Sequence, residues 1–197
     1  MVAGPGNSPK GFKIIQSTDM LTRLADRYGR CMAEITLGGN PIHTSGDLPT
    51  AGSAAPAFTL TKTDLGDVSL GDYAGQNVVL NIFPSVDTAV CATSVRTFNA
   101  RAGEKANTVV LCVSADLPFA QKRFCGAEGL ENVVPVSTFR HPEFLLDYGV
   151  RLADSRMEGL AARAVVVVDG TGNVVHSELV SEVAHEPNYD AALGAIV

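Results

Sequence analysis

Runs of apolar residues divide most of the chain into alternating strands and helices. Continuous apolar runs, which are typical of strands covered on both faces, occur in NVVLNIFP, NTVVLCVSAD and RAVVVVDG. The first run is followed by CATSVRTFNARAGEK, in which Val95, Phe98 and Ala102 have helical spacing. The second run is followed by LPFAQKRFCGAEG, where Pro118 suits a first helical turn. This alternation predicts an α/β fold.

Two glycine-rich turns predict β-hairpins near the two ends of this pattern. One turn is Gly38-Gly39-Asn40 within AEITLGGNPIHTSG, and the other is Asp169-Gly170-Thr171-Gly172 between VVVV and VVHSELV. Weaker elements complete the pattern: a strand in VVPVSTF, a short helix in HPEFLLDYGV and a last helix in EPNYDAALGAI. The sequence therefore predicts a central mixed sheet flanked by helices, with an N-terminal β-hairpin.

Residues 1–31 differ in composition from the rest of the chain. They carry five Lys or Arg residues against two Asp, a net charge of +3, so residues 32–197 carry −9 of the total of −6. The pattern of regular elements starts at Met32. We therefore divide the chain into a flexible N-terminal extension at 1–31, interpreted as an appended leader or an early-assigned start, and one domain at 32–197.

Composition and charge exclude several classes of function. A net charge of −6 without a basic stripe argues against nucleic-acid binding. The longest clean apolar run, Ala164 to Val168, is far shorter than the roughly 20 residues of a membrane span. The N-terminus has no apolar signal region, which favours the cytoplasm, a reducing compartment.

The cysteines and histidines show no metal-binding pattern. Four cysteines are scattered along the chain without a CxxC pair, so a zinc ribbon is not expected. The four histidines lack the HxxH or HExxH spacing of metal ligands, and we interpret them as surface or loop residues. The sequence predicts neither a metal nor an organic cofactor.

Cys91 is the residue whose surroundings point most clearly to chemistry. It follows the loop that leaves the first long apolar strand, at the start of the predicted helix, where unpaired N–H groups and the helix dipole favour an anion. Such a position favours a thiolate, which is the nucleophilic form. Thr88, three residues earlier, either caps the helix or orients a sulfur or bound oxygen, and the two roles are compatible. Pro84 ends the strand in any case, and its fixed φ and missing N–H donor could also stiffen the loop and shield the sulfur from water.

Three further residues bear on this site. Arg163 directly precedes a buried strand, and a guanidinium at a strand end can stabilise a thiolate or a peroxide oxygen. Cys125 lies near the end of the next predicted helix, where Gly126 makes local unwinding easy. Cys112 is centred in an apolar strand, and we expect it to be inert.

The segment FPSVDTAVCATSVRTFN resembles the peroxidatic signature of the thiol peroxidase subgroup of peroxiredoxins. Pro84, Thr88 and Cys91 match its P-x-x-x-T-x-x-C pattern. The resemblance runs from about Ala33 to the C-terminus and includes GLAARAVVVVDG and HSELVSEVAHEPNYDAAL. It implies a thioredoxin-like fold, a homodimer, and reduction of hydrogen peroxide and alkyl hydroperoxides with thioredoxin as the reductant.

The resemblance also implies roles for individual residues. Cys91 corresponds to the peroxidatic cysteine, Arg163 to the active-site arginine, and Cys125, 34 residues after Cys91, to the resolving cysteine. The expected redox disulfide is Cys91–Cys125. Cys112 corresponds to a third cysteine that occurs in some relatives and is not required, whereas Cys31 has no counterpart.

Two other functions remain open at this point. A thiol–disulfide oxidoreductase would need a CxxC pair, and residue 94 is Ser. A non-catalytic redox sensor or binding module would use the same residues as the peroxidase and would differ only in lacking turnover.

Overall fold

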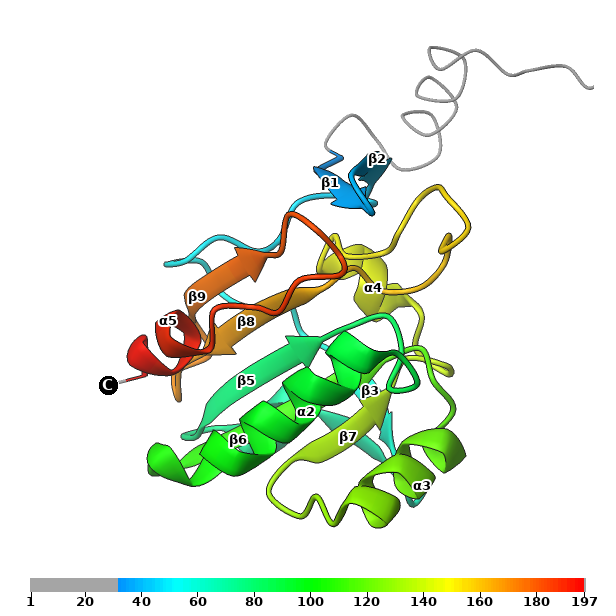
Figure 1. Cartoon of the computed structure of the whole chain (residues 1–197). Coiled ribbons are helices and arrows are strands. Elements are labelled where there is room, and N and C mark those ends of the chain that lie inside the picture. The colour runs from blue at the N-terminus through cyan, green and yellow to red at the C-terminus, as the bar shows by residue number, and fades with distance from the viewer. Residues whose placement is uncertain (1–31, 197) are drawn as a thin grey trace, which may run out of the picture.

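The structure, a computed structural model, describes residues 32–196 and consists of one mixed sheet, a hairpin and flanking helices (Figure 1). In the described chain, seven strands form the sheet in the order β4-β3-β7-β6-β5-β8-β9, and β1 and β2 pair separately. The strands are β1 (Glu34–Leu37), β2 (Asn40–His43), β3 (Thr59–Lys62), β4 (Asp67–Ser69), β5 (Asn77–Ile82), β6 (Thr108–Ser114), β7 (Val134–Ser137), β8 (Ala164–Val168) and β9 (Val174–Leu179). The predicted fold class and N-terminal hairpin are confirmed.

The helices begin and end close to the predicted sequence signals. They are α2 (Ala89–Arg101), α3 (Pro118–Glu128), α4 (Glu143–Asp147) and α5 (Tyr189–Gly194), with short 3-10 turns η1 (Leu70–Tyr73) and η2 (Ala102–Glu104). Pro118 is the first residue of α3, and Gly129 ends this helix in a left-handed conformation with φ 65°. Within residues 32–196, no helix has the length and apolar character needed to cross a membrane.

The two faces of the sheet bury two separate apolar clusters. On one face, α2, α3 and α5 pack against side chains such as Val79, Val110 and Val165. On the other face, α4 and the hairpin pack against Leu80 and the residues that alternate with it. Successive side chains of a strand point to opposite faces, so the alternation along each strand decides which cluster a residue joins.

The pairing of β5 with β8 brings together two distant parts of the chain. These strands are antiparallel, and Ile82 at the end of β5 lies opposite Ala164 at the start of β8. The loop that follows β5 and the residue that precedes β8 therefore meet at the same edge of the sheet. Arg163 continues the alternation of Val165 and Val167, which places it on the face covered by α2.

The proposed division into an extension at 1–31 and a domain at 32–197 stays a prediction. The extension, including Cys31, lies outside the described residues. The described part carries all the elements that the sequence pattern predicted between Met32 and the C-terminus.

Candidate active site

Cys91 lies at the N-terminal end of α2 and is fully buried. The chain leaves β5 through Phe83 and Pro84, and α2 starts at Ala89, so Cys91 is the third residue of the helix. Backbone N–H groups of a first helical turn have no partners inside the helix and favour negative charge. The local fold therefore brings a buried thiol to an electropositive helix end.

Thr88 contacts the sulfur directly. Its Oγ1 lies 2.7 Å from Cys91 Sγ, and it also lies 3.1 Å from the backbone carbonyl of Ser85. Thr88 occupies the N-cap position of α2, but its side chain makes no capping hydrogen bond to the helix backbone. The hydroxyl is thus oriented toward the sulfur rather than toward the helix.

Arg163 reaches the same sulfur from β8. Its Nη2 donates to Cys91 Sγ at 3.3 Å, and its Nε donates to the carbonyl oxygen of Val183 at 3.0 Å. The side chain is 1% exposed, and among the described residues its Nη1 has no hydrogen-bond partner. Because a buried guanidinium donor without a partner is unfavourable, Nη1 is suited to bind a polar atom of a ligand beside the sulfur.

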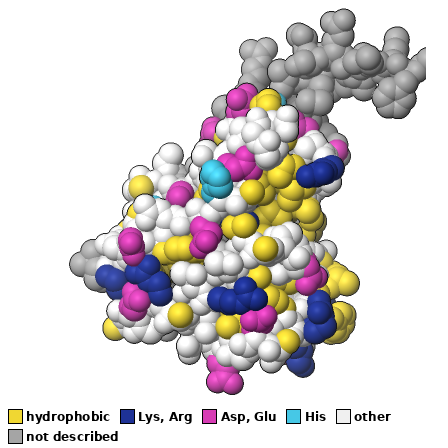
Figure 2. Space-filling view, viewed as in Figure 1, with side chains coloured by type: hydrophobic (Ala, Val, Ile, Leu, Met, Phe, Trp, Pro, Cys, Tyr) yellow, Lys and Arg dark blue, Asp and Glu magenta, His cyan; other side chains and the backbone are white. Residues whose placement is uncertain are grey.

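An apolar cavity of about 200 Å³ opens over these groups. Thr88 and Arg163 are the residues of its lining with polar side chains, and the other lining residues are apolar, including Leu37, Pro84, Val90, Met157 and Val183. Figure 2 shows hydrophobic side chains gathered on this face, between the hairpin and the N-terminal end of α2. A small molecule with one polar end and an apolar chain fits such a lining.

Asp116 holds the loop that presents Thr88 and Cys91. Its carboxylate accepts from Ser85 Oγ at 2.7 Å, from the Val86 N–H at 2.8 Å and from Ser114 Oγ at 2.7 Å. Ser114 is the last residue of β6, so the loop after β5 is fixed to the end of the neighbouring strand. Three hydrogen bonds to one carboxylate make this a stiff support for the helix start.

The two other described cysteines lie in the same apolar cluster as Cys91, and all three are free thiols. Cys125 lies on α3, is 9% exposed, and lines a separate cavity of about 300 Å³ together with Gly126. Burial raises the pKa of its thiol. Burial also raises the pKa of the Cys112 thiol to about 12, and the neighbouring Cys125 adds to this rise.

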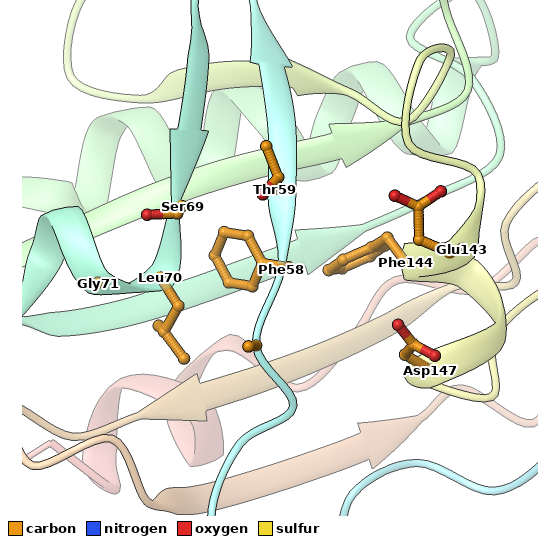
Figure 3. Close-up of a pocket in the computed structure, with 9 residues that line it drawn as sticks. Phe58, Thr59, Ser69, Leu70, Gly71, Glu143, Phe144 and Asp147 are labelled. Carbon is orange, nitrogen blue, oxygen red and sulfur yellow. The ribbon is translucent and has the colours of Figure 1, made fainter.

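A larger cavity of about 410 Å³ lies on the opposite face of the sheet (Figure 3). Phe58 and Phe144 form its apolar side, and the carboxylates of Glu143 and Asp147 stand on α4 at its rim. Its lining contains no cysteine, histidine or arginine. This cavity therefore lacks the groups needed for thiol chemistry, despite its greater volume.

The histidine prediction is wrong for two of the four residues. His43 lies in β2 and His176 in β9, and both side chains are largely covered. His43 Nδ1 lies 2.7 Å from the Asp154 carboxylate. In residues 32–196, no group of three His, Cys, Asp or Glu side chains has an arrangement that could hold a metal ion.

The structure brings together Pro84, Thr88, Cys91 and Arg163, which the sequence suggested, and adds residues that it did not. Asp116 and the Val183 carbonyl were missed because their roles depend on tertiary contacts. Asp116 follows a predicted strand, which was an available signal for a group near the site. Val183 acts through its backbone, so its side-chain type carries no signal.

The sequence matches a known family and close curated relatives. The redoxin family model matches residues 50–193. Thiol peroxidases of Mycobacterium tuberculosis and Mycobacterium bovis are each 64% identical over 165 residues, which cover 84% of this chain and 99% of each relative.

Solved structures give the same fold. A peroxiredoxin-like protein from Aquifex aeolicus is similar with a TM-score of 0.79 and 36% identity, over 85% of this chain and 98% of that chain. A thiol peroxidase from Chromobacterium violaceum has a TM-score of 0.76 over 82% of this chain and 93% of its own, and at 21% identity it supports the fold alone.

Proposed function

The chain belongs to the redoxin family, in its thiol peroxidase group of peroxiredoxins, and on this premise we propose that Cys91 is the residue that reduces the peroxide. The chain is a peroxidase enzyme on a thioredoxin-like fold. One observation carries the assignment of Cys91: its sulfur contacts both Thr88 Oγ1 and Arg163 Nη2, two residues that line an apolar cavity.

In the first step, the Cys91 thiolate attacks the terminal oxygen of a hydroperoxide. An S–O bond forms and the O–O bond breaks, so the sulfur becomes a sulfenic acid and is oxidised by two electrons. The alkoxide or hydroxide leaves and takes a proton from water. Thr88 and Arg163 stabilise the negative charge that passes from the sulfur to the leaving oxygen, and Pro84 keeps water from the sulfur.

In the second step, Cys125 condenses with the sulfenic acid. A Cys91–Cys125 disulfide forms and one water is released. A disulfide requires Cα atoms about 4.4–6.8 Å apart, so the start of α2 and the end of α3 have to loosen. An exposed ion pair between Arg96 and Glu128 at 2.9 Å joins these helices, and such pairs contribute little to stability. A dithiol of the thioredoxin type then restores both thiols by exchange.

The test uses the oxidised protein and two cysteine variants. We expect Cys91→Ser to abolish turnover with thioredoxin, its reductase and NADPH. We expect Cys125→Ser to permit one round of Cys91 oxidation without recycling. Mass spectrometry of the oxidised wild type should show the Cys91–Cys125 disulfide, and a dominant Cys91–Cys112 link would contradict the assignment of Cys125.

The same assay separates the enzyme from a redox sensor. Steady consumption of peroxide over many turnovers supports the thioredoxin-linked cycle, whereas a single burst that stops would favour the sensor. We place the reaction in the cytoplasm, because a dithiol reductant acts in a reducing compartment.

We also propose a homodimer, supported by an exposed apolar patch near the active-site loop. Leu117, Phe119 and Phe139 are 52%, 64% and 42% exposed. Their segments lie side by side, because Thr138 N donates to the Ser114 carbonyl at 2.9 Å. Apolar patches of this kind are typical of subunit interfaces. Light scattering should give the mass of a dimer for the wild type and of a monomer for Phe119→Asp.

A further inference from the structure

Glu182 lies outside the catalytic contacts, yet its carboxylate accepts hydrogen bonds from two separate parts of the chain. In the hairpin, the donors are Thr36 Oγ1 at 2.8 Å, the Gly38 N–H at 3.1 Å and the Gly39 N–H at 3.0 Å. On its own segment, the donor is the Ala184 N–H at 3.1 Å. A surface carboxylate needs no such set of partners for solubility alone.

The hairpin turn has the backbone conformation of an anion-binding nest. Gly38 and Gly39 have φ values of 60° and 78°, which direct both N–H groups to the same side of the turn. The Glu182 carboxylate is the anion that these groups bind. Together the four donors lower the pKa of Glu182 to about 2, with the Gly39 N–H making the largest contribution.

Backbone hydrogen bonds beside Glu182 join the same two segments. Thr36 N donates to the Ser181 carbonyl at 2.7 Å, and Val183 N donates to the Thr36 carbonyl at 2.9 Å. Glu182 thus sits between two residues whose backbones pair with β1. The side chain of Glu182 binds the tip of the hairpin, and the backbone on either side of Glu182 pairs with β1, the first strand of the hairpin.

This junction forms part of the active site. The carbonyl of Val183 accepts from Arg163 Nε, so it fixes the guanidinium that contacts Cys91. Leu37, Val183 and Ala184 line the same cavity as Thr88 and Arg163. Ala184 itself donates to the Glu182 carboxylate, and Val183 is its neighbour in the chain. Leu37 lies between Thr36 and Gly38, which both donate to the same carboxylate.

We propose that Glu182 is a positioning residue for peroxide reduction, which holds the cavity wall of Leu37, Val183 and Ala184 in place for the organic part of an alkyl hydroperoxide. The inference rests on the proposed function of Cys91 and Arg163. Glu182 touches neither the sulfur nor the substrate. It acts through the hairpin and through the segment that supports Arg163.

Replacing Glu182 by Gln separates its effect on the apolar cavity wall from its effect on the position of Arg163. The amide retains one acceptor oxygen and turns an NH₂ donor toward N–H donors, so one of the Gly38 and Gly39 N–H groups loses its acceptor. Arg163 keeps the Val183 carbonyl through the remaining backbone pairing, whereas the link between the apolar wall and the hairpin tip is weakened. The loss should therefore be greater for a bulky alkyl hydroperoxide than for hydrogen peroxide, which makes no use of an apolar wall.

The experiment measures the rate constant of Cys91 oxidation in one turnover, by rapid quench with an alkylating reagent and mass spectrometry. We expect Glu182→Gln to lower the rate constant about tenfold with cumene hydroperoxide, comparable to one lost charge-assisted hydrogen bond, and by a clearly smaller factor with hydrogen peroxide. Thr36→Val removes one donor to the same carboxylate and should give the same substrate preference with a smaller loss.

Glu178→Gln is the matched control. Glu178 lies on β9, and its carboxylate accepts from the Asn188 N–H at 3.0 Å, away from the cavity lining. This variant loses the same charge and should react like the wild type with both peroxides. Circular dichroism establishes that each variant is folded, and Thr36→Val provides the test if Glu182→Gln does not fold.

The outcomes separate this inference from the proposed function. Equal rate constants for wild type and both variants, or equal losses with the two peroxides, would overturn the role of Glu182. If the wild type is oxidised at a cysteine other than Cys91, the proposed function itself fails.

Discussion

Cys91 and Cys112 are buried to the same extent in one apolar cluster, but their sulfurs have different neighbours. Cys91 is 0% exposed and Cys112 is 1% exposed. Cys91 contacts a guanidinium and a hydroxyl, whereas the contact of Cys112 is the Asn81 amide at the long distance of 3.7 Å. Burial without strong donors favours the neutral thiol at Cys112, whereas the donors beside Cys91 can stabilise negative charge that develops during reaction.

The position in the sheet explains this difference. Cys112 lies inside β6, where neighbouring strands take up the backbone hydrogen bonds and apolar side chains surround the sulfur. Cys91 lies beyond the end of β5, where a helix starts and where Arg163 directly precedes β8. Reactive groups gather at strand ends because charged and polar side chains can converge there.

Replacing Cys91 and Cys112 in separate variants should give the largest difference in peroxidase activity. Cys91→Ser should reduce steady-state peroxidase activity to the background rate, because serine lacks a comparably nucleophilic anion. Cys112→Ala should keep the activity and destabilise the fold by about 1 kcal/mol. Activity assays and urea unfolding measure the pair, and a loss of activity in Cys112→Ala with the fold intact would contradict an inert Cys112.

Replacing the Arg163 guanidinium by an amine should have the next largest effect on the rate of Cys91 oxidation. Arg163→Lys keeps a positive charge but cannot donate to both Val183 and Cys91 with a planar group. We expect the rate constant of Cys91 oxidation to fall about 100-fold, the lower range for loss of one donor to a developing charge. Rapid-quench kinetics with hydrogen peroxide measures it, and a rate near that of the wild type would exclude Arg163 from the reaction.

Removing the hydroxyl should have a smaller effect. Thr88→Val preserves the shape of the side chain and deletes the donor at 2.7 Å from the sulfur. We expect about a tenfold slower oxidation, the value of one hydrogen bond to a charged group. Thr93→Val is the control on the same helix, since Thr93 donates to the Ala89 carbonyl and should leave the rate unchanged.

The pH dependence of stability tests the Cys112 side of the comparison. Burial raises the folded-state pKa of Cys112 to about 12, above its ordinary value of 9.0, so the folded protein favours the neutral thiol. This preference contributes fully to the free energy of unfolding below pH 9, and the contribution is lost as the pH rises toward 12. The difference in unfolding free energy between wild type and Cys112→Ala should therefore shrink above pH 9. A constant difference in urea unfolding would contradict the raised pKa.

The sequence predicted the fold, and it singled out the candidate site around Cys91, because the signals for both are local. Apolar runs and helical spacing mark β5, α2 and β6, and a helix start after a strand marks Cys91. Asp116 and Glu182 could not be identified in the same way. Each acts by accepting hydrogen bonds from segments distant in sequence, as in the bond from Gly38 to Glu182 across 144 positions.

The histidines also show that local sequence patterns do not identify contacts between distant segments. The hairpin pattern predicted the strand that holds His43, but its contact with Asp154 joins residues more than 100 positions apart and carries no local signal. Local pattern describes what a segment forms, and only the assembled sheet decides which segments become neighbours.

The pairing of Ile82 with Ala164 has a consequence for how the fold can be monitored. A slip of one residue between β5 and β8 would turn Arg163 to the other face and remove it from Cys91. Rapid reaction with peroxide thus reports correct strand register. A library of substitutions in β5 and β8 could be screened for native register by the rate of one chemical reaction, without purifying or crystallising any member.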